Sequence, residues 1–188
     1  FHSLIYNRLM KKLLTKLFAT ITCTLVIALT TLLPVTAADA AFDLGKNLYS
    51  TNYIFLDADT GQVLSAKKQD EQISIASLTK MMTVLLAIEN SSSLNQTVTI
   101  TDEMIDGFYD EQASVAGYIN GDTATLLDLC YAAAVPSAAD AANALAIQIG
   151  GSFEKFYQMM NDKAAQLGMN HTVFKSAHGL DRDGQYST

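Results

Sequence analysis

Two residues of the chain have the types and the spacing of a nucleophile and its base, Ser77 and Lys80. Residues three apart lie on one face of a helix, so the lysine amine can reach the serine hydroxyl and remove its proton. The amine must be neutral for this step, and burial in an apolar environment lowers the pKa of a lysine in that direction. Apolar residues recur at helical spacing from Ser77 to Asn90, which predicts a helix that is apolar nearly all round and therefore buried.

The same Ser-x-x-Lys spacing occurs twice more in the chain. Ser65 and Lys68 fall in a predicted strand, where an odd offset points side chains to opposite faces. Ser152 precedes Lys155 directly after two glycines at a predicted helix start, where a hydroxyl caps backbone N–H groups. We therefore expect an N-cap at Ser152, and a catalytic pair only at Ser77 and Lys80.

The pattern along the chain predicts one mixed domain over residues 41–188. Residues 53–66 have the signature of a β-hairpin with its turn at residues 57–61. The other expected elements are a strand over residues 97–100, a helix start at 101–104, a polar loop over 106–122, helices over 123–134, 138–149 and 152–167, and an extended piece near 172–174. A single hairpin without long strands later in the chain leaves a sheet edge unpaired, so we expect either that another chain covers this edge or that the sequence stops early.

Composition and charge narrow the class of protein. The chain has 188 residues, 49% of them hydrophobic, and a formal net charge of −7. Its bases form no cluster outside the N-terminus, which argues against a nucleic-acid partner. Three lysines precede the uncharged residues 17–35, and small residues follow, so residues 1–40 are expected to be upstream residues and a secretory signal cleaved after Ala37 or Ala40. The alternative is an uncleaved membrane anchor, because the apolar run approaches the ~20 residues of a spanning helix.

The remaining cysteine and histidines are predicted to have structural roles, with no part in catalysis or metal binding. Cys130 is the one cysteine after the signal, which leaves no internal disulfide, and its apolar helical context predicts a small core residue. His171 and His178 have no partner at a metal-ligand spacing and are expected on the surface or in turns. We expect no metal and no cofactor.

Several separated segments, taken in their order along the chain, resemble a single family. They are Asp57–Leu64, Ile75–Thr83, Val135–Ser137, Ala141–Ala144, Asn161–Ala164, Leu167–Met169 and His178–Asp181. Together they resemble the low-molecular-mass penicillin-binding proteins, which are serine D-alanyl-D-alanine carboxypeptidases, over roughly residues 53–188. The resemblance implies an α+β fold of the β-lactamase and penicillin-binding-protein transpeptidase type, truncated here before its C-terminal sheet strands. It also implies an exported enzyme of the cell envelope.

Carried over by position, the resemblance implies a role for three residues. Ser77 would attack the carbonyl of the D-Ala-D-Ala bond, Lys80 would be the general base, and Ser137 would relay the proton toward the leaving D-alanine. The implied partners are the peptidoglycan pentapeptide as substrate and β-lactams as covalent inhibitors. Association with a membrane surface would depend on a C-terminal segment that the chain lacks.

The chain departs from the family pattern at two places. The family has Asn two residues after the serine of the second motif, and this chain has Ala139. No Lys-Thr-Gly or Lys-Ser-Gly occurs in the chain, so its substrate-binding residues are unknown and the activity of the chain alone is in doubt. We expect the 188 residues to be the N-terminal portion of a family member.

Two alternatives to the carboxypeptidase interpretation stay open on these residues. A class A-like β-lactamase shares the Ser-x-x-Lys start and the acyl-enzyme chemistry. A non-catalytic cell-wall scaffold on a decayed penicillin-binding fold would account for Ala139.

Overall fold

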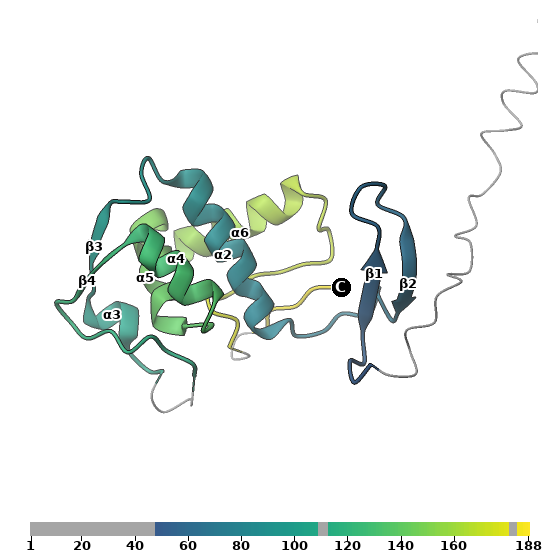
Figure 1. Ribbon diagram of the computed structural model, residues 1–188, viewed down its shortest axis with the longest axis horizontal. Helices are drawn as coiled ribbons and strands as arrows, with labels where there is room; N and C mark the ends of the chain where they lie inside the picture. The colour runs from purple at the N-terminus through teal and green to yellow at the C-terminus, as the bar shows by residue number, and fades with distance from the viewer. Residues whose placement is uncertain (1–47, 109–112, 181–183) are drawn as a thin grey trace, which may run out of the picture. The chain divides into compact units, whose positions relative to one another are not determined.

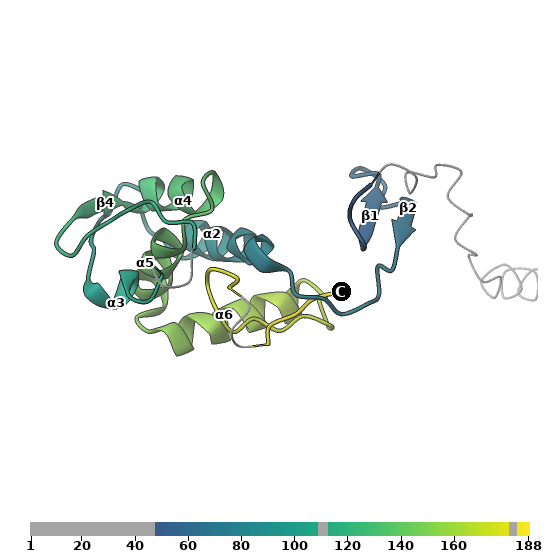
Figure 2. The ribbon, with the colours of Figure 1, turned by 90° about the horizontal axis from the view of Figure 1, so that it is seen from below.

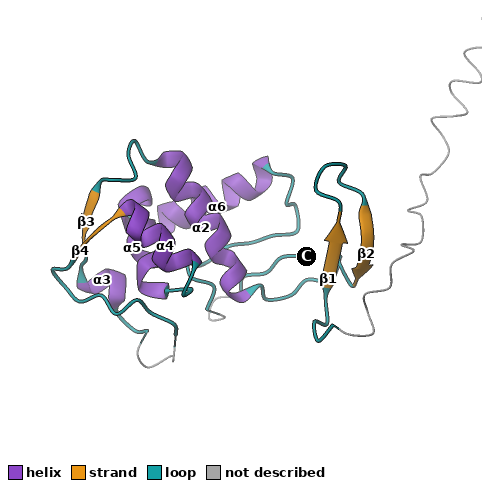
Figure 3. Cartoon of the chain, in the orientation of Figure 1, coloured by secondary structure: helices purple, strands orange, loops and turns teal. Residues whose placement is uncertain are grey.

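The computed structural model describes residues 48–108, 113–180 and 184–188 (Figure 1). The secretory signal predicted over residues 1–40 lies outside them. The chain divides into two compact units, one ending at Lys68 and the other spanning Gln69–Thr188. Helices and strands are both present, as expected for an α+β fold (Figure 3). Within the described ranges, no helix combines the length and the apolar character needed to cross a membrane.

The first unit contains the predicted hairpin. Strand β1 (Tyr53–Leu56) pairs antiparallel with strand β2 (Val63–Lys67). The Asp57 carboxylate closes the turn by accepting hydrogen bonds from the backbone N–H groups of Asp59 and Thr60. Gly61 has a φ of 71°, a left-handed conformation that glycine adopts without steric cost.

The second unit begins with η1 (Ala76–Leu78), a 3₁₀ turn, which runs directly into helix α2 (Thr79–Asn90). Strand β3 (Thr97–Thr99) and helix α3 (Asp102–Ile105) follow. Strand β4 (Thr123–Thr125) pairs antiparallel with β3, and both lie at the same end of this unit as α3 (Figures 1 and 2). The prediction of a helix from residue 123 onward was wrong for its first three residues, because these threonine-rich residues pair with β3 before helix α4 (Leu126–Ala134) begins.

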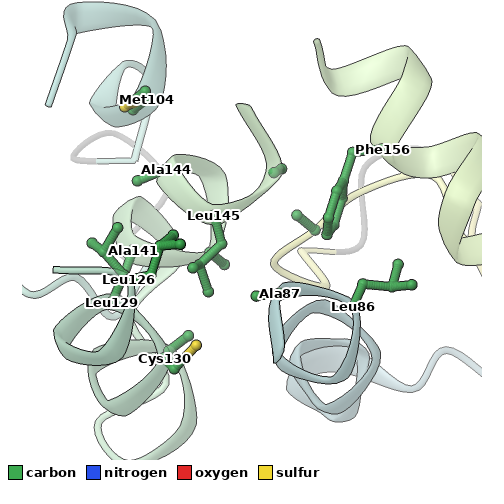
Figure 4. Packing of buried hydrophobic residues seen from close by; sticks show 14 of the residues in the cluster. Leu86, Ala87, Met104, Leu126, Leu129, Cys130, Ala141, Ala144, Leu145 and Phe156 are labelled. Atoms are coloured by element: carbon green, nitrogen blue, oxygen red, sulfur yellow. The ribbon is translucent and has the colours of Figure 1, made fainter. Parts of the chain in front are cut away.

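Helix α5 (Ala139–Gly150) forms the centre of the second unit and packs against α2, α3, α4 and helix α6 (Phe153–Gln166). Its residues from Ala139 to Ala146 are all buried, and most of them are alanines. Burial of consecutive residues over two turns means that other elements cover this part of the helix on all sides. Figure 4 shows Leu145 of α5 in the core that also contains Ala87 of α2, Cys130 of α4 and Phe156 of α6.

Helix α2 differs from its prediction. Its inner face is buried, including Lys80, Met82 and Leu86, but Met81 is 72% exposed. Leu78 in the preceding turn and Ile88 are exposed as well. The helix therefore has one apolar face that the core of its own unit does not cover, although the sequence predicted burial all round.

The last described residues return to the start of the unit. Ile73 forms an isolated antiparallel bridge with Ser187, and Val173 forms one with Tyr186. The extended piece predicted near residues 172–174 is therefore confirmed at Val173. These bridges bring the segment after α6 alongside the segment that leads into η1.

The structural interpretation of Cys130 is confirmed, because the residue is buried in the core and burial raises the pKa of its thiol. His171 is exposed in a turn, as expected. His178 lies in a bend but is buried, and its ring meets Phe108 edge to face at 5.2 Å between centroids. The expectation of a position on the surface or in a turn therefore holds for its backbone, whereas its side chain is not at the surface.

Candidate active site

Ser77 lies in the middle of η1, two residues before α2 begins. The prediction placed it on an α-helix, whereas the backbone here is a 3₁₀ turn that starts at Ala76. Ala76 has a φ of 45°, which is uncommon for a residue with a Cβ atom. Ser77 is exposed to solvent just before the first turn of α2.

Lys80 lies in the first turn of α2 and is 5% exposed. Its Nζ atom is 3.1 Å from Ser77 Oγ and 3.1 Å from Ser137 Oγ. It also donates to the backbone carbonyl of His178 at 2.7 Å. The structure thus brings together the three residues that the sequence singled out and adds a carbonyl acceptor.

Burial lowers the pKa of the Lys80 amine, because desolvation disfavours the charged form. A neutral amine has two N–H groups and one lone pair. The N–H groups can donate to the His178 carbonyl and to Ser137, which leaves the lone pair to accept the proton of Ser77. The arrangement can therefore activate Ser77 as a nucleophile.

Ser137 precedes α5 and is half-buried. Its φ is 62°, in the left-handed region. Among the described residues, three non-glycine residues have a positive φ, and two of them, Ala76 and Ser137, line the same cleft. Uncommon backbone conformations of this kind concentrate at functional sites.

The cleft around these residues has a volume of about 550 Å³. Ser77, Lys80 and Ser137 supply its polar groups. Its other lining residues are mostly apolar and come from the segment before α2, from α2 and from α4: Ile75, Ala76, Leu78, Met81, Val84, Ala133 and Ala134. A concave site with apolar walls and a few convergent polar groups is typical of a ligand-binding site.

The segment Ser176–Gly179 contacts α2 through backbone carbonyl groups, a role that the sequence did not reveal. Besides the His178 carbonyl, the Ala177 carbonyl accepts a hydrogen bond from the buried Thr83 hydroxyl at 2.7 Å. Gly179 has a φ of 85°, and a Cβ atom there would lie 1.9 Å from the Ala76 carbonyl oxygen. The motif His178–Asp181 pointed to this segment, but backbone carbonyls leave no signal in a sequence.

The other candidates lie elsewhere. Ser152 is the N-cap of α6, with its Oγ accepting from the Lys155 N–H, so the predicted cap is confirmed. Ser65 is buried in β2, where its hydroxyl lies 3.3 Å from the Tyr53 hydroxyl. Ala139 is 2% exposed and does not line the cleft. Within the described part of the chain, no group of three or more His, Cys, Asp or Glu residues could hold a metal.

Comparison with known protein families identifies the family of this chain. The family model of peptidase S11, D-alanyl-D-alanine carboxypeptidase, matches residues 36–188. The chain belongs to this family. The resemblance seen in the sequence motifs is thereby confirmed.

Curated relatives agree with this assignment to the peptidase S11 family. D-alanyl-D-alanine carboxypeptidase DacF of Bacillus subtilis (strain 168) is 34% identical over 139 residues, which are 72% of this chain and 35% of that protein. D-alanyl-D-alanine carboxypeptidase DacC of Escherichia coli (strain K12) is 34% identical over 142 residues, 72% of this chain and 36% of that protein. The chain thus spans about a third of the length of these relatives.

Solved structures share the fold of this S11 family member. The Streptomyces K15 DD-transpeptidase superposes with a TM-score of 0.68 at 34% identity, covering 73% of this chain and 55% of the other. The α+β penicillin-binding-protein fold expected from the motifs is therefore confirmed. The comparisons favour the carboxypeptidase family over the class A-like β-lactamase alternative.

Proposed function

We propose that residues 41–188 contribute the Ser-x-x-Lys part of the catalytic domain of a serine D-alanyl-D-alanine carboxypeptidase. The observation that carries this proposal is the position of Lys80 Nζ, 3.1 Å from the hydroxyls of both Ser77 and Ser137 in one cleft. The family membership supports the substrate class, a peptidoglycan stem peptide that ends in D-Ala-D-Ala.

The proposed reaction follows from the positions of these three side chains. Lys80 accepts the proton of Ser77, and Ser77 Oγ attacks the carbonyl carbon of the terminal peptide bond. Ser137, which also contacts Lys80 Nζ, passes the proton to the amine of the leaving D-alanine. The bond between Ser77 and the acyl group is then hydrolysed by water, which regenerates the serine.

β-Lactams are the expected inhibitors, because opening their strained cyclic amide leaves the same ester bond on Ser77. An enzyme with this substrate acts outside the cytoplasm. Export of the chain and a cell-envelope location are therefore part of the proposal, and the basic and apolar residues before Ala40 support them. The membrane-surface association suggested by the family resemblance stays a prediction.

The test uses the protein expressed from its complete gene and a fluorescent penicillin. We expect one covalent adduct, located on Ser77 by mass spectrometry of its peptides, and release of D-alanine from a peptide ending in D-Ala-D-Ala. Ser77→Ala removes the proposed attacking hydroxyl and should abolish the adduct. An adduct on another residue, or none, would contradict the proposal, and complete absence of acylation would favour the non-catalytic scaffold.

Ser152→Ala is the matched control, since it changes a serine with the same Ser-x-x-Lys spacing. Loss of the N-cap of α6 should lower the free energy of unfolding by about 1 kcal/mol and leave acylation unchanged. Rapid hydrolysis of a chromogenic cephalosporin by the wild-type protein would instead support the β-lactamase alternative.

A further inference from the structure

A buried carboxylate lies three residues after Ser137. Asp140 is 3% exposed, and each of its two oxygen atoms accepts two backbone hydrogen bonds. One oxygen accepts from Ala116 at 2.9 Å and from Ala141 at 2.9 Å, and the other accepts from Gly117 at 3.0 Å and from Tyr118 at 3.3 Å. Three of these four donors belong to residues 113–118, a loop that is distant from α5 in sequence.

The same loop holds the backbone on both sides of Ser137. The Ser114 carbonyl accepts a hydrogen bond from the Ala139 N–H at 2.8 Å. The Ser114 hydroxyl donates to the Pro136 carbonyl at 2.6 Å. Ser137 therefore sits between two residues that are each hydrogen-bonded to Ser114.

We call the two hydrogen bonds of Ser114, to Pro136 and to Ala139, the clamp. The clamp flanks Ser137, whose backbone conformation needs support. A serine at a φ of 62° is in an unfavourable region, and such conformations persist only where the surrounding structure imposes them. The position of Ser137 Oγ, 3.1 Å from Lys80 Nζ, depends on this backbone conformation. Removing the clamp would let Ser137 relax and move its hydroxyl away from the amine.

We propose that Asp140 is a positioning residue for Ser137. By accepting three backbone hydrogen bonds from the 113–118 loop, it fixes the loop that grips Pro136 and Ala139 and so keeps Ser137 in its left-handed conformation. Asp140 does not line the cleft and does not touch the reacting groups. The inference rests on the proposed function, because it takes Ser137 as the proton relay and names Asp140 as the residue that holds Ser137 in position.

Asp140→Asn tests this role with a side chain of nearly the same shape. Both carboxylate oxygens accept hydrogen bonds, and an amide has only one acceptor atom, so its NH₂ group must face two N–H donors. We expect the first-order rate constant of acylation by a fluorescent penicillin to fall about tenfold or more, as expected for a misplaced catalytic group. Hydrogen exchange of the peptide that covers residues 113–118 should become faster in the same variant.

Asp128→Asn is the matched control. Asp128 is also an aspartate in the first turn of a helix, and it accepts the Thr125 N–H in the capping box of α4. Its substitution removes the same charge from the first turn of a helix, but Asp128 is exposed and bonds Thr125 in a capping box, with no hydrogen bond to the 113–118 loop. Acylation and loop exchange should both stay within about twofold of the wild-type values.

Ser114→Ala supplies a second variant if Asp140→Asn does not fold. Ser114 is exposed, and the change deletes one hydrogen bond of the clamp, so we expect a smaller decrease in acylation, about threefold, without loss of folding. Acylation of a folded Asp140→Asn protein at the wild-type rate would overturn the inference. If Asp140→Asn does not fold, acylation of Ser114→Ala at the wild-type rate would overturn it. Unchanged loop exchange in folded Asp140→Asn would also overturn it, and this readout does not require activity. A wild-type protein that is not acylated would instead overturn the proposed function.

Discussion

At the scale of single residues, the site depends on how one amine is surrounded. Lys80 is buried, and the acceptors within hydrogen-bonding distance of its Nζ atom include two hydroxyls and the His178 carbonyl. Neutral oxygen atoms do not offset the cost of burying a charge as a carboxylate would. The pKa of Lys80 is lowered for this reason, and its neutral form is the one that can act as a base.

This environment leads to a prediction about pH. Because the reactive form of Lys80 is deprotonated, acylation of Ser77 should accelerate as the pH rises, about tenfold per pH unit below the pKa of Lys80, and then level off. The plateau should begin below the ordinary pKa of a lysine, since burial shifts the pKa downward. Stopped-flow measurements with a fluorescent penicillin between about pH 6 and pH 10 would determine the profile.

Two lysine variants serve as controls for this profile. In Lys80→Arg the guanidinium stays protonated, so acylation should be lost across the whole pH range. Lys155→Arg changes the other helical Ser-x-x-Lys pair and should keep the wild-type profile. A rate that does not depend on pH in the wild-type protein would exclude Lys80 as the base.

At the scale of elements, the surroundings of a motif determine its function. The Ser-x-x-Lys spacing occurs three times. Ser65 lies in strand β2, with Lys68 just beyond its end, and its hydroxyl lies near the Tyr53 hydroxyl. The Ser77 hydroxyl in η1 contacts Lys80, and Ser152 is the N-cap of α6. The short strand β4 also depends on its partner, because residues 123–125 are extended only through pairing with β3. A local signal for the true start of α4 was present, since Thr125 and Asp128 form a capping box.

Close packing between the Ser176–Gly179 segment and η1 yields a prediction about Gly179. In Gly179→Ala the new methyl group would clash with the Ala76 carbonyl, and the left-handed backbone at a φ of 85° would add its own cost. We expect the free energy of unfolding to fall by about 2–4 kcal/mol in urea titrations. Acylation should also decrease, because the carbonyl of the neighbouring His178 contacts Lys80.

Gly168→Ala isolates the backbone contribution to this effect. Gly168 has a φ of 76°, but no atom lies within 4 Å of the position of its added Cβ. This variant should lose about 1 kcal/mol of stability and keep normal acylation. Equal effects of the two substitutions would mean that the contact with Ala76 contributes nothing.

At the scale of the whole molecule, the site is assembled from distant parts of one unit. Lys80 contacts Ser137 across 57 positions and His178 across 98 positions of the sequence. The bridge between Ile73 and Ser187 and the hydrogen bond from Gln185 to Thr79 hold the ends of this unit together. The site therefore exists only once residues 69–188 have folded as a unit.

A prediction for the whole chain concerns its export. The basic residues before residue 17, the uncharged run and the small residues that follow predict that the exported protein begins at Ala38 or Ala41. Intact-mass measurement of the protein recovered from outside the cytoplasm would establish its first residue. Replacing both Ala37 and Ala40 by leucine should block cleavage, and a wild-type product that retains residues 17–35 would instead indicate a membrane anchor.

The sequence by itself indicated the local elements and the pair of residues on which the proposed chemistry rests. The types and spacing of Ser77 and Lys80, the hairpin and the N-cap at Ser152 depend on neighbouring residues, so their patterns were sufficient to predict them. Only the tertiary structure decided which carbonyl Lys80 contacts, why residue 179 must be glycine and how Asp140 holds the loop beside Ser137. These features rest on backbone atoms, which every residue carries, brought together by packing between segments far apart in the chain.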